Sequence, residues 1–193
     1  MTLSYHNLIA HISSYISLSE IDIETIKSSF EIIEVKKNTL LEEENKLTKY
    51  LYFIDKGFVR VFYVKDGEER STQINCPSRF ISSYQSFIMQ TKAYDNVQSI
   101  TDCVLYRITK EQLDELSEKV EKWNYFGEKI YEQALVFNEE RTRDMILLTA
   151  EERYLKLIKT QPEIIKNVPL QYIASYIGIK PESLSRIRKQ LNF

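Results

Sequence analysis

The basic side chains near the end of the chain have the clearest chemistry. Arg186, Arg188 and Lys189 fall within ten residues of the end, and such side chains bind phosphate and the acceptor edge of guanine. Apolar residues recur at helical spacing through residues 168–191, but Gly178–Pro181 interrupts them. Gly commonly ends a helix, and Pro is favoured in the first turn of the next one. The spacing therefore predicts two short helices joined by a tight turn, which is the pattern of a DNA-reading helix-turn-helix.

An ordinary αα-hairpin has the same spacing, and the charge distribution argues against it. Residues 141–193 contain 10 Lys and Arg against 5 Asp and Glu, whereas residues 1–140 contain 16 against 23. The net charges are therefore +5 and −7. A basic patch releases counterions from the phosphate backbone and provides most non-specific affinity for nucleic acid. Double-stranded DNA is the favoured partner.

Composition limits the remaining function classes. The chain has 193 residues, 43% hydrophobic and 28% charged, which is typical of a globular protein of one or two domains. No apolar run approaches the roughly 20 residues that span a bilayer, and the first residues lack a secretory pattern, so we expect a cytoplasmic protein without membrane contact. Cys76 and Cys103 are too few for a disulfide framework or a four-ligand zinc site. His6 and His11 fit a surface or core position better than a metal site, and no metal or cofactor is expected.

The middle of the chain has the character of β-structure. Residues 32–108 contain short β-rich runs, including 50–54 and 58–64, and the Asp66-Gly67 pair that follows is a strong hairpin-turn signal. Residues 97–108 supply a further pair of strands. Several short strands at this spacing predict a small β-barrel or sandwich.

Helical segments flank this region. Residues up to Phe30 form short helices with Ser19 as an N-cap, and the chain is helical again from Lys110. A coiled-coil seam is predicted from spacings of four and three at Trp123, Gly127, Ile130, Ala134 and Phe137. Phe126 and Leu135 widen the apolar face, which we expect to pack against the β-domain. The alternative is a single amphipathic helix packed on its own domain. Because helix-turn-helix proteins usually bind DNA as dimers, we interpret this helix as the dimer interface.

Three segments resemble the Crp/Fnr superfamily of bacterial transcription regulators. Leu51–Val61 is similar to the strand, turn and strand that the family writes as YLVLEGSVRV. Asp102–Leu113 is similar to its last strands and the following helix, and Pro181–Arg186 to the S-R-E-T-V-S-R recognition helix. The resemblance implies an α+β fold: an N-terminal antiparallel β-roll, a long dimerisation helix and a C-terminal helix-turn-helix domain. The implied domains are residues 1–115, 116–143 and 144–193.

The same resemblance assigns DNA contacts. The recognition helix would enter the major groove, where Glu182 accepts from cytosine and Arg186 donates to guanine or phosphate. Glu182 could instead be an acidic residue that stabilises the first turn of its helix. Pro181 stands where the family often has a base-reading Arg, which leaves specificity at that base pair open. The other expected DNA-binding residues are Gln171, Lys180, Ser183, Ser185, Arg188 and Lys189.

The effector pocket departs from the family pattern. Cyclic-nucleotide-binding members carry F-G-E-L-A and then R-S-A, which correspond here to Phe80–Tyr84 and Ala93–Asp95. Ala93 replaces the Arg that holds the cyclic phosphate, and a buried phosphate without its cation is costly, so cAMP and cGMP are disfavoured. Two cysteines cannot hold a family iron–sulfur cluster, and the β-region has no His for haem. The candidate pocket residues for another small molecule are Phe80, Ser82, Ser83, Tyr84 and Tyr94. Packing of the roll against the dimer helix is the favoured explanation for the aromatic ones.

These observations predict a sequence-specific transcription regulator that binds a pseudo-palindromic operator as a homodimer, without control by cyclic nucleotide. RNA polymerase is a further expected partner. The alternative is a protein-interaction or small-molecule-binding module that does not bind DNA. An enzyme is not expected, because the consecutive acids at Glu42–Glu44 point in different directions and neither His lies near a nucleophile motif.

Overall fold

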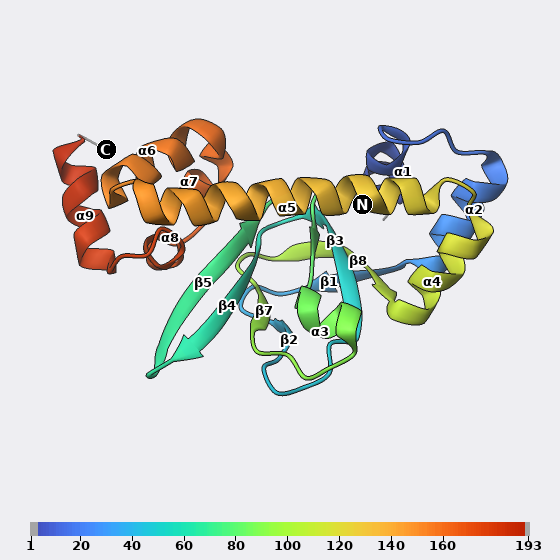
Figure 1. The fold of residues 1–193 in the computed structure, drawn as a ribbon, viewed down its shortest axis with the longest axis horizontal. Coiled ribbons are helices and arrows are strands. Elements are labelled where there is room, and N and C mark those ends of the chain that lie inside the picture. The colour runs from blue at the N-terminus through green and yellow to red at the C-terminus, as the bar shows by residue number, and fades with distance from the viewer. Residues whose placement is uncertain (1–3, 192–193) are drawn as a thin grey trace.

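A computed structural model describes residues 4–191, and one long helix organises it. In Figure 1 this helix, α5 (Trp123–Leu147), crosses the whole molecule, with the strands along one side and helical groups at both ends. No helix within the described range is long and apolar enough to cross a membrane. The α+β class predicted from the sequence is confirmed.

The strands form two four-stranded antiparallel sheets. The first sheet has the order β1 (Glu31–Val35), β8 (Cys103–Thr109), β3 (Tyr50–Lys56), β6 (Phe80–Ile81). The second has the order β2 (Leu40–Glu42), β7 (Asn96–Ser99), β4 (Val59–Lys65), β5 (Glu68–Asn75). Buried residues such as Ile54, Val61 and Leu105 form the core of this roll. The short helix α3 (Tyr84–Met89) connects β6 to β7.

Local signals in the sequence explain several boundaries. Asp66 and Gly67, with φ of 54° and 75°, connect β4 to β5, and two positive φ values are what a tight type I′ hairpin turn needs. Helix α1 (His6–Ser13) precedes α2 (Glu20–Ser29), and α2 begins at the predicted N-cap. There the Ser19 hydroxyl accepts from the Asp22 N–H at 3.1 Å, and the Asp22 carboxylate accepts from the Ser19 N–H at 2.8 Å.

The long helix differs from the segment 116–143 expected for it. Residues 116–119 belong to a separate helix, α4 (Lys110–Lys119), and α5 continues to Leu147. The break falls at Val120, which adopts an extended conformation and is buried in the apolar core beside Trp123. Burial of Val120 therefore outweighs the helical propensity of its neighbours. Four helices follow: α6 (Ala150–Thr160), α7 (Pro162–Asn167), α8 (Leu170–Tyr176) and α9 (Pro181–Gln190).

Candidate functional site

Helices α8 and α9 are joined by the predicted tight turn. Gly178, between them, has φ of +79°, a conformation that costs glycine little. The Ile179 N–H donates to the Ala174 carbonyl at 3.0 Å, which closes the end of α8. Ala174 and Leu184 are fully buried where the two helices pack together. The pair therefore has one fixed geometry, and it presents the outer face of α9 to solvent.

The exposed face of α9 brings together four of the predicted DNA-binding side chains. Glu182, Ser185, Arg186 and Lys189 are all exposed, and their spacing of three, one and three residues places them on one side of the helix. The helix lies at one extremity of the molecule, beyond the end of α5 (Figure 1). This exposed face of α9 can therefore approach a flat or grooved partner without obstruction from the roll.

Four predicted DNA-binding residues lie apart from this exposed face. Gln171 is exposed on α8, and Lys180, just before α9, forms an ion pair with Glu68 of the β4–β5 hairpin. Ser183 is half-buried and accepts from Arg186 at 3.2 Å. Arg188 is also half-buried, and its buried Nε has no hydrogen-bond acceptor within residues 4–191. The ninth, Pro181, occupies the first turn of α9, as expected for a proline that begins a helix.

The open edge of the second sheet is covered by α8. Strand β5 is an edge strand, so its outer N–H and C=O groups lack a neighbouring strand. The Ser71 N–H donates to the Ser175 hydroxyl at 2.8 Å, and that hydroxyl donates to the Glu69 carbonyl at 3.0 Å. The Ser175 hydroxyl thus takes the place of the backbone groups that a neighbouring strand would offer here. Covering an edge strand in this way is one means by which proteins protect an exposed sheet edge.

A buried arginine, Arg60 on β4, strengthens the same contact. Its side chain is 1% exposed and its guanidinium stacks between the rings of Phe62, at 4.0 Å, and Tyr172 of α8, at 3.8 Å. Arg60 also donates to the Glu69 carboxylate at 2.5 Å and to the Gln98 side chain at 2.7 Å. The guanidinium therefore has partners on the roll and on α8, and it joins the two by charge, hydrogen bonds and stacking.

Arg141 of α5 makes a third connection. Its guanidinium donates to the Tyr176 carbonyl at 3.0 Å and to the Ser71 carbonyl at 3.4 Å, and it lies 4.4 Å from the Tyr176 ring. Burial lowers the pKa of this group. An apolar cluster continues the contact, because Phe58 and Ile74 of the roll pack with the core of the C-terminal helices. No local pattern in the sequence marks Arg60, Arg141 or Ser175, since each meets its partners only in the folded chain.

Ser175→Ala is expected to weaken this docking by about 1 kcal/mol, the typical net value of a hydrogen bond whose partners water can reach. The Ser71 N–H loses its acceptor and should exchange faster with solvent. Hydrogen exchange at that amide measures the effect directly. Ser28→Ala provides a control, because the Ser28 hydroxyl bonds only within α2 and should leave the Ser71 amide unchanged. Unchanged protection of Ser71 in the Ser175 variant would contradict the assignment.

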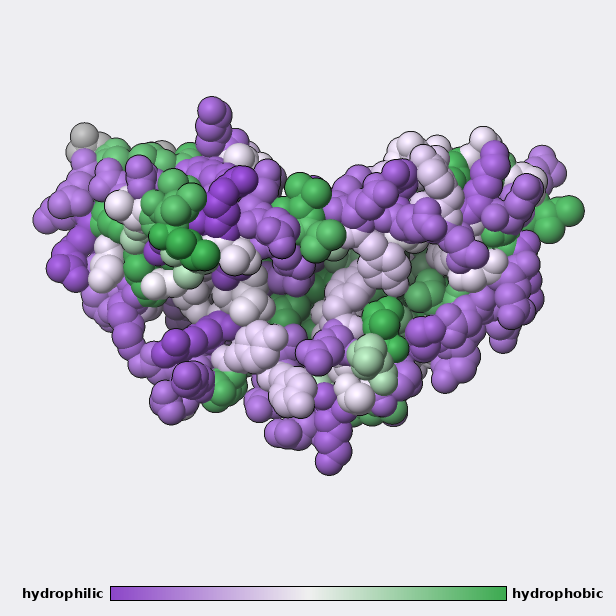
Figure 2. Space-filling view, viewed as in Figure 1, coloured by the Kyte–Doolittle hydropathy of each residue, from purple (hydrophilic) through white to green (hydrophobic). Residues whose placement is uncertain are grey.

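The predicted dimer seam faces inward. Trp123 is 4% exposed in the chain's own core, and Ile130 packs against the same core. Gly127, Ala134 and Phe137 are half-buried along that side of α5. Leu135, in contrast, is 63% exposed, so the expectation that it packs on the β-domain was wrong. A second set of positions with spacings of four and three is exposed in the single chain and also borders the two cavities beside α5. We call it the outer strip of α5: Tyr131, Leu135, Asn138, Thr142 and Met145. Apolar side chains interrupt the polar surface midway along α5 in Figure 2.

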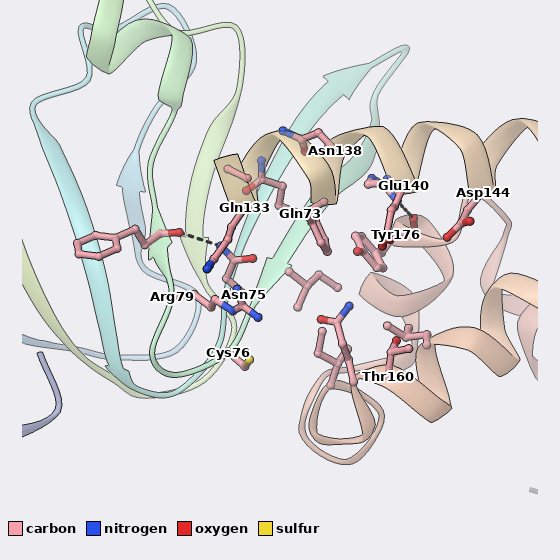
Figure 3. A pocket seen from close by; sticks show the side chains of 18 of the residues that line it. Gln73, Asn75, Cys76, Arg79, Gln133, Asn138, Glu140, Asp144, Thr160 and Tyr176 are labelled. Carbon is pink, nitrogen blue, oxygen red and sulfur yellow. Dashed lines mark hydrogen bonds between the residues drawn. The ribbon is translucent and has the colours of Figure 1, made fainter. Parts of the chain in front are cut away.

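A cavity of about 770 Å³ lies between the roll, α5 and the C-terminal helices. Figure 3 shows Asn75, Cys76 and Arg79 on its roll side and Asp144 and Tyr176 across from them. The predicted pocket residue Phe80 lines this cavity, and its carbonyl accepts from the Asn75 side chain at 3.0 Å. Among the described residues, no group of three or more His, Cys, Asp or Glu side chains is placed to hold a metal ion.

A second cavity, of about 490 Å³, lies between the roll and α5, and Ser82 and Tyr84 line it. Ser83 is buried close by, whereas Tyr94 is 66% exposed, so its expected role in lining a pocket is not supported. Tyr94 lies in the connection between α3 and β7. Ala93, which stands at the family's phosphate-binding Arg, is buried.

Comparison with known proteins identifies the fold. Residues 32–120 match the family model of the cyclic nucleotide-binding domain. Among solved structures, the c-di-GMP-responsive regulator CLP of Xanthomonas campestris is 18% identical, with a TM-score of 0.71, over 90% of this chain and 92% of that one. FixK2 from Bradyrhizobium japonicum is 16% identical, with a TM-score of 0.71, over 84% of each chain.

A third structure, from Eubacterium rectale and described as a regulator of the crp/fnr family, is 15% identical with a TM-score of 0.69, over 93% of this chain and 88% of that one. No curated protein matches the chain by sequence. At these identities the structural matches concern the fold. Residues 32–120 are therefore similar to a cyclic nucleotide-binding domain, and the chain as a whole shares the fold of these Crp/Fnr-type regulators.

Proposed function

We propose that the protein is a transcription regulator that binds double-stranded DNA as a homodimer through α8 and α9. The observation that carries this proposal is the exposed face of α9, where Glu182, Ser185, Arg186 and Lys189 share one side of the helix. An α-helix fits the major groove, and these side-chain types match its donors, acceptors and flanking phosphates. The proposed reading is that Glu182 and Arg186 contact base edges and that Ser185 and Lys189 contact the backbone.

Dimerisation supplies the second half of the site. A second copy of the chain would pack against the outer strip of α5, Tyr131, Leu135, Asn138, Thr142 and Met145. Their alternating spacing is that of a two-helix seam. Because α5 leads directly into the C-terminal helices, pairing along it would place two α9 helices in a fixed relation. Two-fold half-sites are then expected about 34 Å apart, one turn of DNA.

In this proposal the roll is a sensor-type or structural domain, α5 is the dimer helix and α6–α9 are the DNA-binding domain. The buried alanine at position 93 supports a regulator that is not controlled by cAMP or cGMP, because an alanine side chain carries no charge to neutralise a phosphate. Bacterial cytoplasm is the expected location, and RNA polymerase is the partner through which a DNA-bound regulator would act.

The experiment that tests this function is selection from a random double-stranded DNA pool at two salt concentrations. A two-fold-symmetric motif with half-sites one turn apart is the expected result. Binding that is sensitive to salt but gives no motif would limit the C-terminal helices to phosphate contacts. No binding at low salt would contradict the proposal and favour a protein-interaction or small-molecule-binding module.

Arg186→Ala is expected to reduce affinity for the selected motif by about 1–3 kcal/mol, since it removes a donor from the proposed base contact. Quantitative gel shift or fluorescence anisotropy measures this. Lys119→Ala is the matched control: it removes one positive charge from α4, at the other end of α5 from α9 (Figure 1). Equal affinity losses in the two variants would mean that Arg186 acts only through net charge.

A further inference from the structure

The cavity of about 490 Å³ between the roll and α5 is lined by one acidic and one basic side chain. Two of its lining residues are charged, Asp95 from the roll and Arg141 from α5. The remaining lining side chains are neutral, with polar ones contributed by both sides, such as Gln73 and Ser82 on the roll and Thr142 on α5. The volume is within the range of small-molecule sites, about 300–1,000 Å³.

Asp95 has no ion-pair partner in the part of the chain that the structure describes. Its Oδ1 is buried and has no hydrogen-bond donor within the described residues, while the Ser83 hydroxyl donates to the same carboxylate. Burial raises the pKa of Asp95, and the nearby Glu44 raises it further. A buried acceptor without a donor costs free energy, so it marks a place where a ligand's donor would be stabilised.

Arg141 likewise has no ion-pair partner within residues 4–191. Its hydrogen bonds go to the carbonyls of Tyr176 and Ser71 and to the Tyr176 side chain, and none of these groups neutralises its charge. Burial lowers the pKa of Arg141, the Tyr176 side chain raises it, and the cationic Arg153 lowers it. A guanidinium has five N–H donors and stays protonated in proteins, so donors remain for an anion beyond those that bond to Tyr176 and Ser71.

The opposite charges of Asp95 and Arg141 together determine which class of ligand the cavity can bind. A cyclic phosphate would suit Arg141 but would leave Asp95 facing a like charge, and a simple cation would leave Arg141 unpaired. We propose that this cavity binds a small zwitterion, whose cationic group pairs with Asp95 and whose anionic group pairs with Arg141. The proposal is independent of DNA binding, because it concerns the occupancy of the cavity alone.

The test is calorimetric titration of the full chain with an ω-amino acid series: glycine, 4-aminobutyrate and 6-aminohexanoate. Butylammonium and butyrate carry one charge each and are the comparators, and cAMP is the anionic nucleotide. We expect at least one amino acid to bind at least about tenfold more tightly than either comparator, which corresponds to about 1.4 kcal/mol. This comparison uses the unmodified protein, so its outcome does not depend on whether a variant folds.

Asp95→Asn should reduce the affinity of that amino acid by at least about tenfold, because it removes the charge and keeps the shape. Asp66→Asn is the matched control, since Asp66 is exposed in the hairpin turn, where Asn tolerates the positive φ equally. The proposal is overturned if no amino acid of the series binds, or if one comparator or cAMP binds as tightly. Unchanged affinity in the Asp95 variant would overturn it too.

Discussion

Arg60→Ala is expected to lower the free energy of unfolding by about 3 kcal/mol, one of the largest effects of any single change in this chain. The guanidinium is 1% exposed and stacks between Phe62 and Tyr172. Its removal leaves a void and takes the cation from Glu69. The side chain of Glu69 is 48% exposed, so water can partly solvate its carboxylate, which keeps the loss at the lower end of the range for buried ion pairs.

Arg107→Ala is the matched control. Arg107 also stacks on a ring, Tyr50 at 4.3 Å, and pairs with a glutamate, Glu31 at 2.7 Å. It is 27% exposed and both partners belong to the roll, so we expect a loss of about 0–1 kcal/mol. Urea unfolding at one fixed protein concentration compares the two variants. Equal losses would mean that the burial of Arg60 under α8 adds no stability.

A local measurement shows where the stability is lost. The Ser71 amide, which donates to Ser175, reports the contact between β5 and α8. Arg60→Ala should speed hydrogen exchange at Ser71 much more than in the core of the roll, for example at Leu105. Arg60 would then be identified as a residue that holds the C-terminal helices, and with them α9, in one position on the roll.

Local signals in the sequence were sufficient for most of the fold. The Asp66-Gly67 turn, the Ser19 cap and the break at Gly178 each depend on a few neighbouring residues, and each is present in the structure. The order of strands and helices followed from such signals, and it also carried the resemblance to the Crp/Fnr superfamily.

The orientation of α5 could not be predicted in the same way. The helix has apolar residues at coiled-coil spacing on two sides, one with Trp123 and Ile130 and the other with Tyr131 and Leu135. Periodicity identifies both sides equally, and only packing against the roll shows that the first is inside. The docking of α8 on β5 could not be predicted from the sequence either, because Ser175 and Ser71 are 104 residues apart in the chain.

The cavity was partly predictable. The sequence showed that Ala93 replaces a phosphate-binding Arg, which is a local substitution. It did not show that Asp95 and Arg141 face one cavity, since they lie on different elements and charged residues are usually solvated. Buried charges whose partners are distant in sequence are therefore the main functional features that only the structure supplied.

Leu135→Asp is expected to weaken the proposed dimer by about 3 kcal/mol or more, roughly a 150-fold change in dissociation constant. Leu135 is 63% exposed, so the change should leave the fold of the single chain intact. In the dimer it would place a carboxylate in the middle of the outer strip of α5, where neither water nor a cation compensates it. Sedimentation velocity over a range of concentrations measures the shift, with circular dichroism as the check on folding.

Val136→Asp is the control that distinguishes an effect on the outer strip from a general effect of a new charge on α5. Val136 is 59% exposed and adjacent in sequence, but it projects about 100° away around the helix, outside the strip. Val136→Asp should leave the dimer intact, and equal disruption by both variants would contradict the proposed seam.

DNA-binding measurements test whether dimerisation matters for function. Leu135→Asp should reduce affinity for the full palindrome much more than for a single half-site. If both sites lose affinity equally, the substitution acts on α9 and not on the pairing of two chains.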